Sequence, residues 1–275
     1  CTEQEEIIDI VLSCTNEKVK QSFIDTMELV KLEYIETCDN LKYLTSVEMA
    51  WQPLYQHDFN RCKDSFQRII NLISWMSTVS KFYGKPDRVA PVFEKISNQL
   101  VHFAKCNRPK AVATNLSGDT NQFQYKVLFS EENLEDYIAF FDKCIDMKKT
   151  FVAEFRKKKQ SLQEHPTVPQ FNFDEETTFC HILVFCSRIG TLREMFSHYR
   201  SIAKISKSLL HNVAPPIIGI LAKSFVAIYT KCRNPFDHDL NGKGFESACG
   251  SFMNDIRACE NKIETAIIDL VTKAR

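Results

Sequence analysis

The feature that most constrains this 275-residue chain is the spacing of its apolar side chains. In nearly every long segment they recur every three or four residues, which places them on one face of an α-helix. Alternation with a period of two, which is typical of β-strands, does not extend over a useful length. Glycine is scarce at 7 residues and phenylalanine is plentiful at 21, which favours helices packed through aromatic rings. We therefore predict an all-α fold, an elongated stack of antiparallel helical bundles and hairpins.

About seven helices are expected, and three of them lie in the N-terminal half. The first carries a long apolar stripe, and the next two are separated by Gly84 and Pro86, which mark a stop and a restart. These two helices should form a hairpin. The side chains expected to face a core are Val19, Phe23, Met27, Val30, Tyr34, Cys38, Leu41 and Leu44, then Phe66, Ile69, Ile70, Ile73 and Met76, and then Val89, Phe93, Ile96, Leu100 and Phe103.

Four more helices are expected in the C-terminal half. Ser130 should cap the first, and Asn172 with Glu175 should form a reciprocal cap at the second. The third follows Pro215 and Pro216, and the fourth follows a polar loop. The expected core-facing side chains are Leu134, Ile138, Phe141, Ile145, Val152 and Phe155, then Phe179, Leu183, Cys186, Ile189, Phe196 and Tyr199, then Leu221, Phe225 and Ile228, and finally Phe245, Cys249, Phe252, Ile256, Cys259, Ile263, Ile267 and Leu270.

The apolar period fails after Cys106, in a stretch rich in proline, asparagine, serine and glycine that is typical of a loop. We place a boundary between subdomains there. Residues 1–108 are predicted to form a first helical bundle, residues 109–130 a loop linker, and residues 131–275 a second helical bundle.

The charges do not favour a nucleic-acid or membrane partner. The chain carries 35 basic and 35 acidic side chains, so it lacks the imbalance that either surface would require. Its richest apolar stretch, residues 215–222, is interrupted by Lys223 well before the roughly 18–20 residues that a membrane span needs. We expect no membrane span.

Eleven cysteines are spread singly along the chain, and an odd number is unusual for a disulfide framework. Cys38, Cys144, Cys249 and Cys259 fall on apolar helical stripes, where free cysteine packs as a small apolar residue. Buried, reduced thiols are therefore expected, which fits a protein of a reducing compartment such as the cytosol.

Two apparent metal sites are incomplete. The segment Asp237–Gly242 has the first, third and fifth ligands and the glycine of a calcium-binding EF-hand loop, but Ala248 stands where the loop needs a glutamate. We interpret it as a polar loop between helices. Cys180, His181 and Cys186 resemble part of a zinc cluster, but no second ligand pair lies at a suitable spacing.

No motif for catalysis is present. The chain has no glycine-rich phosphate loop ending in Lys-Ser or Lys-Thr, no Gly-x-Ser-x-Gly and no His-Glu-x-x-His. We therefore predict no catalytic, cofactor-binding or metal-binding residues. The basic run Arg156–Lys159 is interpreted as a solvated face near a helix end, with an acidic partner surface as the alternative. The triplet Asn115–Ser117 matches a glycosylation acceptor, but such triplets arise by chance.

Several short motifs follow one another along essentially the whole chain. They are Asp39-Asn40-Leu41-Lys42-Tyr43-Leu44 with Gln52-Pro53-Leu54-Tyr55; the segment Ile73 to Tyr83 with Pro86-Asp87-Arg88-Val89; Lys95-Ile96-Ser97-Asn98-Gln99-Leu100; Phe171-Asn172-Phe173-Asp174-Glu175 with Phe185-Cys186-Ser187-Arg188-Ile189; and Pro235-Phe236-Asp237 leading to Phe245 and Phe252-x-x-Asp255-Ile256. In order and spacing they resemble the N-terminal tail region of dynein heavy chains. Gly84 and Lys85 depart from that pattern, so the turn they form is expected to be less firmly fixed.

The resemblance implies a non-catalytic stem of helical bundles in a microtubule-based motor complex. Such tails join heavy chains to other heavy chains and to intermediate chains, light chains and axonemal docking factors. The ATPase ring and the microtubule-binding stalk of such motors would lie far beyond Arg275. Variants at Pro86 and at Asn98-Gln99 resemble ciliary tails, which favours a location in the cytoskeleton of the cilium axoneme.

One alternative from a different class stays open, which is an unrelated helical tether or adaptor subunit without a motor. Exposed aromatic or methionine side chains left over from core packing are the expected docking spots in either case. The sequence does not identify them, because an apolar stripe is more often core than interface.

Overall fold

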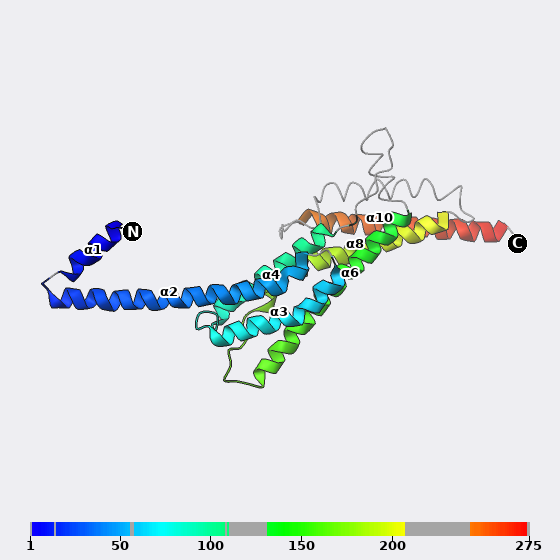
Figure 1. The fold of residues 1–275 in the computed structure, drawn as a ribbon. Coiled ribbons are helices and arrows are strands. Elements are labelled where there is room, and N and C mark those ends of the chain that lie inside the picture. Colours follow the sequence, from blue (N-terminus) through cyan, green and yellow to red (C-terminus); the bar gives the residue numbers. More distant parts are fainter. Residues whose placement is uncertain are drawn as a thin grey trace.

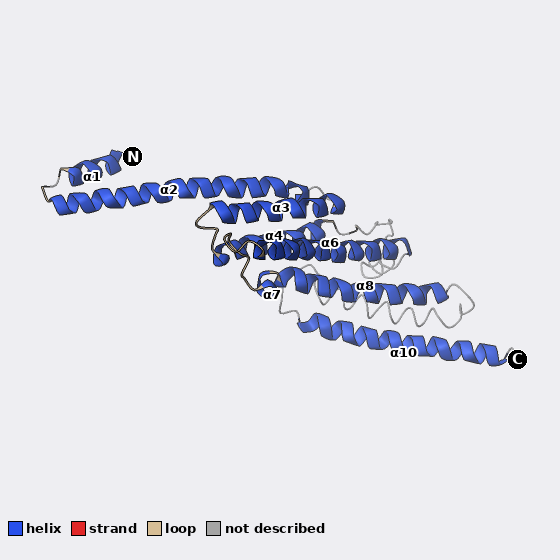
Figure 2. Cartoon of the chain, turned by 90° about the horizontal axis from the view of Figure 1, so that it is seen from below, coloured by secondary structure: helices blue, strands red, loops and turns tan. Residues whose placement is uncertain are grey.

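All regular secondary structure in the described residues of the computed structural model is helical. The helices lie side by side in an elongated stack, which Figure 2 shows most clearly. The predicted all-α fold and stacked arrangement are confirmed. The described residues are 2–13, 15–55, 58–107, 109, 131–206 and 243–273. Their helices are α1 (Thr2–Leu12), α2 (Glu17–Trp51), the short 3-10 helix η1 (Gln52–Tyr55), α3 (Phe59–Val79), α4 (Pro86–Cys106), α6 (Glu131–Gln163), α7 (Glu175–Thr178), α8 (Cys180–Ser206) and α10 (Lys243–Lys273).

Only the C-terminal end of α2 packs into the body of the stack. Val47 and Ala50 are buried there, and the ring of Tyr43 meets the ring of Trp75 on α3 edge to face at 5.2 Å. The other end of α2 projects away with α1 folded back beside it (Figure 1). We call α1 and the part of α2 before Asp39 the arm.

The core is built around phenylalanine rings from several helices. The ring of Phe93 on α4 lies 5.1 Å from Phe155 on α6, 5.0 Å from Phe171 and 6.4 Å from Phe179, measured between ring centroids. All four rings are 2% exposed or less. Edge-to-face pairs of this kind add to the free energy gained by burying apolar area. The cluster therefore ties α4 to α6 and to the segment that leads into α8.

Helices from both sides of the predicted linker contribute to this core. The helix α6 lies beside α3 on one side and α8 on the other (Figure 2). The hydroxyl of Tyr137 on α6 donates a hydrogen bond to the carbonyl oxygen of Pro109 at 3.2 Å. Residues 110–130 lie outside the described residues. The proposed limits of the two bundles and the linker therefore stay a prediction.

Most of the expected core is confirmed, including every expected position of α3 and α4. Ile145, Val152 and Leu183 are only partly buried, while Ile267 is 44% exposed. The cap expected at Ser130 and the helix expected after Pro216 lie outside the described residues. Confirmed core positions in the second half are Leu134, Ile138, Phe141, Phe155, Phe179, Cys186, Ile189, Phe196, Cys249, Phe252, Ile256, Cys259 and Ile263.

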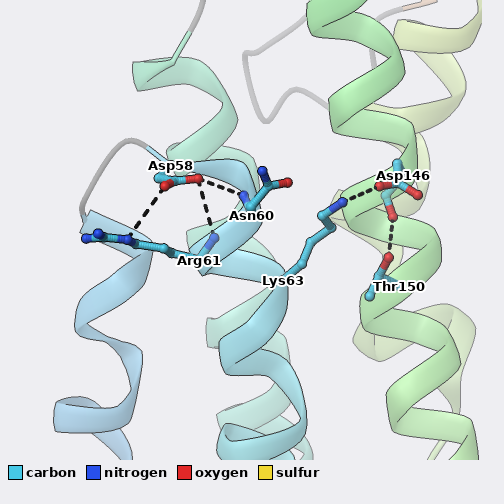
Figure 3. A network of polar contacts seen from close by, with 6 residues as sticks. All are labelled: Asp58, Asn60, Arg61, Lys63, Asp146 and Thr150. Atoms are coloured by element: carbon cyan, nitrogen blue, oxygen red, sulfur yellow. Dashed lines mark hydrogen bonds and ion pairs between the residues drawn. The ribbon is translucent and has the colours of Figure 1, made fainter.

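The start of α3 is fixed by Asp58 (Figure 3). One of its carboxylate oxygens accepts hydrogen bonds from the backbone N–H groups of Asn60 at 2.9 Å and Arg61 at 3.4 Å. These donors have no partner within the helix itself, so the cap stabilises its first turn. One turn further on, Lys63 donates to Asp146 on α6 at 2.7 Å, which links the two helices at the surface.

Replacing Asp58 with alanine should lower the free energy of unfolding by about 1 kcal/mol, because the cap is lost. Urea denaturation followed by circular dichroism would measure it. Asp64→Ala is the matched control, since Asp64 is exposed on the same helix and is not its cap. The control should stay within about 0.5 kcal/mol of the parent chain. Equal losses in both variants would show that charge, and not capping, is responsible.

The turn between α3 and α4 suits a glycine. A Cβ atom at Gly84 would lie 3.1 Å from the carbonyl oxygen of Ser77 and 3.2 Å from that of Ser80, which is tighter than ordinary contacts. Lys85 makes no side-chain cap bond, as the sequence suggests, and Pro86 occupies the first helical position. Proline there needs no partner for a backbone N–H.

Ser80 also holds this turn against α2. Its hydroxyl donates to the side-chain oxygen of Asn40 at 2.6 Å and accepts a bond from the backbone N–H of Tyr83 at 3.1 Å. Two motifs of the family pattern, separated by forty residues, therefore meet at one point. The turn is fixed by this long-range contact, although Lys85 adds no side-chain cap.

The reciprocal cap predicted from Asn172 and Glu175 is wrong. Asp174 is the N-cap of α7, and its carboxylate accepts hydrogen bonds from the backbone N–H groups of Glu176 at 3.3 Å and Thr177 at 3.0 Å. These bonds, together with one from the Thr177 hydroxyl, hold the pKa of Asp174 below its ordinary value. Asn172 and Asp174 are both residue types that cap helices, and the path of the chain places Asp174 at the helix start.

Glu175 has a different partner, which revises the interpretation of the basic run. Its carboxylate accepts hydrogen bonds from Lys159 at 2.8 Å and from Arg156 at 3.0 Å, both on α6. Partial burial alone would raise the pKa of Glu175, but the two cations outweigh it and lower the pKa. Lys159 is only 25% exposed. Half of the run is therefore paired within the chain, while Arg156 and Lys157 stay exposed, as a solvated face requires.

Glu175→Gln should lower the free energy of unfolding at pH 7 by about 0.5–1 kcal/mol, because two charge-assisted bonds are weakened at a half-buried site that water still partly screens. A lowered pKa stabilises the folded chain above the ordinary value of 4.5, and this contribution is lost as pH falls through the folded pKa. The variant and the parent should therefore converge below pH 4.5 in urea titrations. Glu176→Gln is the control, and its free energy of unfolding at pH 7 should stay close to that of the parent chain.

Candidate functional site

The arm exposes apolar side chains that the sequence assigns to a core. Five of the eight residues in the first predicted stripe remain between 42% and 68% exposed, four of them on the arm and one just beyond it: Val19, Met27, Val30, Tyr34 and Leu41. The predicted helix is confirmed, but the prediction that this stripe is buried within the chain is wrong. Isolated exposed apolar residues are common on proteins, whereas a contiguous stripe marks an interaction surface.

Local sequence explains why the helix persists beyond the body of the stack. Asn16 caps α2, since its side-chain oxygen accepts bonds from the backbone N–H groups of Lys18 at 3.1 Å and Val19 at 3.4 Å. Side-chain contacts one turn apart follow, with Lys20 lying 3.7 Å from Glu17. No glycine or proline interrupts the 35 residues of α2. The helix can therefore form without tertiary partners along its first half.

A groove runs between α1 and α2, with a volume of about 540 Å³. Its floor on α2 carries four side chains at intervals of four, three and four residues, so they lie along one face of the helix. Ile8 and Leu12 line the groove from α1. We call this surface the seam, and it consists of Ile8, Leu12, Phe23, Met27, Val30 and Tyr34.

A second groove, of about 590 Å³, lies where α2, η1 and α4 meet. Aromatic side chains line it, among them Trp51, Tyr55 and Phe82. The guanidinium of Arg88 lies 4.9 Å from the centre of the Phe82 ring, a cation–π contact. Opposite charges lie together at its edge, since Arg88 is 3.5 Å from Asp87. The charges that line this groove balance, since Glu48 and Asp87 are matched by Arg88 and Lys95.

The cysteine and histidine candidates do not form a metal site. Cys186 is buried, with its sulfur 3.8 Å from the carbonyl oxygen of Cys144, while Cys180 and His181 are half-buried. No group of three metal-ligating side chains occurs among the residues that the structure describes. The Asp237–Gly242 loop and the Asn115 triplet lie outside them. That the chain lacks site residues stays a prediction.

Of the helices in the described ranges, none combines the length and the apolar character that spanning a membrane requires.

Sequence comparison decides the family. The family model described as "Dynein heavy chain, N-terminal region 1" matches residues 3–275, which is nearly the whole chain. This chain belongs to that dynein tail family. The matched region is the tail of the heavy chain and not its motor domain. Membership also disfavours the alternative of an unrelated tether or adaptor.

Curated relatives agree with this assignment. The chain is 26% identical to mouse dynein axonemal heavy chain 8 over 256 residues, which cover 92% of this chain and 5% of the relative. It is 26% identical to rat dynein axonemal heavy chain 5 over 178 residues, covering 65% of this chain and 5% of the relative. The flagellar outer-arm dynein gamma chain of Chlamydomonas reinhardtii is 24% identical over 162 residues, or 59% of this chain and 3% of the relative. The chain thus spans about a twentieth of the relatives it matches.

Within the tail, the structure brings several motif residues together. Asn40, Tyr43, Trp75 and Ser80 are distant in sequence but meet where α2 joins α3. They anchor the base of the arm. The seam itself lies before the first motif, so the family pattern gives no sign of it. The available signal was the spacing of Phe23 to Tyr34, which is equally typical of a core helix.

Proposed function

We propose that this tail segment is an assembly scaffold, and that the arm is the part that contacts other subunits of the motor complex. It performs no catalysis of its own. The partners are other dynein heavy chains, intermediate chains, light chains or axonemal docking factors. The observation that supports this proposal is the seam, an apolar stripe on a helix that extends beyond the body of the stack.

The family relationship supports a role in cilia or flagella. Axonemal and flagellar relatives favour a place in the cytoskeleton of cilia or flagella. The whole heavy chain, of which this segment would be a small part, would be an ATP-driven microtubule motor. A stack of helices transmits force along its length and presents long lateral surfaces to partners.

A binding experiment with axonemal extract tests the proposal. The tagged 275-residue chain should recover dynein heavy, intermediate or light chains, identified by mass spectrometry. The double variant Met27→Asp/Val30→Asp places two charges in the seam and should lose them. Leu29→Asp/Leu32→Asp is the matched control, because both leucines are more than 60% exposed and neither lines the groove. Recovery of no dynein subunit, or equal recovery by both variants, would contradict the proposal.

A further inference from the structure

We infer that the seam binds a basic amphipathic helix of a partner protein. The inference rests on the proposed function and deepens it, since it names the chemistry of the partner. Three observations support it: the shape of the seam, its apolar floor and the net charge of the arm.

The shape of the seam fits a helix. The short helix α1 folds back over the start of α2 (Figure 1). Both helices line the groove between them, and a third helix laid into it would complete a small three-helix bundle. Phe23, Met27, Val30 and Tyr34 repeat at intervals of four, three and four residues. This interval is the one at which a helix presents knobs to a neighbouring helix.

The floor of the seam needs a cover. Met27, Val30 and Tyr34 are 42%, 56% and 68% exposed although they lie on one face. Covering them removes apolar area from water, which is the main source of binding free energy in helix-in-groove complexes. Apolar anchors on the partner are therefore required, but they do not distinguish one helix from another.

The arm that forms the seam carries a net negative charge. Residues 2–36 contain nine acidic and three basic side chains, a net charge of −6, although the whole chain is neutral. The helix α1 has four acidic side chains and no basic one. Glu6 and Asp9 are exposed on α1, and Glu28 lines the groove from α2.

The cations of α2 do not reverse this balance. Lys20 already lies beside Glu17 at 3.7 Å, so its charge is partly compensated. Lys31 lines the groove opposite the acidic helix α1. A partner with lysine or arginine beside its apolar stripe would meet an arm of opposite net charge.

Charge also argues against a second copy of the arm as the occupant. Two arms packed seam to seam would bring two charges of −6 together, and like charges at an interface disfavour the complex. A basic helix has the opposite effect, because its charges speed association and select against acidic competitors. The partner is thus defined by positive flanks and an apolar stripe.

Two synthetic peptides of about four heptads test the inference. They share one leucine stripe, but one carries lysine and the other glutamate at the flanking positions. Fluorescence anisotropy with the 275-residue chain should show the lysine peptide binding on the order of tenfold more tightly, with a dissociation constant that rises with salt. Met27→Asp/Val30→Asp should abolish binding, and Leu29→Asp/Leu32→Asp should not. Glu6→Gln/Asp9→Asn should reduce the preference for lysine.

Each other outcome overturns the inference. If both peptides bind equally well, charge does not select the partner. If neither peptide binds, the seam is not a binding site for a helix. If the chain dimerises by analytical ultracentrifugation and Met27→Asp/Val30→Asp restores a monomer, a second copy covers the seam. In that case the proposed scaffold role stands while the basic helix is wrong. The scaffold role itself fails only in the extract experiment, so the two failures are distinguishable.

Discussion

Phe93→Ala is expected to lower the free energy of unfolding by about 3–5 kcal/mol. The ring is fully buried and contacts Phe155 on α6 as well as Phe171 and Phe179. Removing it leaves a cavity at the point where α4 meets α6, because three neighbouring rings cannot all move inward. Urea denaturation monitored by circular dichroism measures the change.

The control for this substitution is Phe82→Ala. Phe82 is 41% exposed, so the same chemical change should cost about 1 kcal/mol or less. If Phe93→Ala does not fold, Phe93→Leu keeps most of the volume and should recover most of the stability. If Phe93→Ala lowers the free energy of unfolding no more than Phe82→Ala does, the ring cluster does not hold α4 against α6.

The buried thiols should be about a thousandfold less reactive toward iodoacetamide than an ordinary cysteine at pH 8. Burial raises the pKa of Cys62 and of Cys186 from the ordinary value of 9.0 to about 12, so their reactive thiolates are scarce. Burial raises the pKa of Cys144 as well. Cys106 is exposed and serves as the internal control. Peptide mass spectrometry at timed intervals gives each rate.

The same thiols make stability depend on alkaline pH. A pKa that is raised in the folded chain stabilises that state below the ordinary value of 9.0, and this contribution is lost as pH rises toward about 12. Stability should therefore decline over this alkaline range. In urea all cysteines should react at similar rates. Equal rates for Cys62 and Cys106 in the folded chain would contradict the buried position of Cys62.

Much of the fold follows from apolar spacing. The stripes of α3 and α4 predict their helices and their buried faces, because each has a neighbour that needs that face. Cys144, Cys249 and Cys259 are buried, as expected, while Cys38 is half-buried. Periodicity reports which side chains share a face, and in a stacked helix the shared face is the core.

The same rule fails on the arm for a physical reason. The stripe from Val19 to Tyr34 has helical spacing, but nothing in the described part of the chain covers it apart from the short α1. Periodicity cannot distinguish a face that packs within the chain from one that waits for another molecule. Net charge over residues 2–36 is the observation that separates this helix from the core helices, and it becomes informative only once the arm is seen.

Contacts between residues far apart in the chain could not be predicted from the sequence either. Glu175 could be a cap by its position, and it becomes an ion-pair partner only because α6 places Lys159 and Arg156 beside it. Likewise, Asn40 meets Ser80 because α2 and α3 run antiparallel. Local rules set where helices begin, whereas the geometry of packing decides which polar side chains find each other.

The unbroken course of α2 makes the arm a lever. About 23 residues separate its first turn from the anchor at Asn40, which corresponds to roughly 35 Å of helix. A tilt of about 10° at the anchor would then displace the tip by roughly 6 Å, more than one helical turn. Occupancy at the tip and the packing of α2 against α3 are therefore mechanically connected, and strain in a loaded complex would be felt first at Asn40, Tyr43 and Ser80.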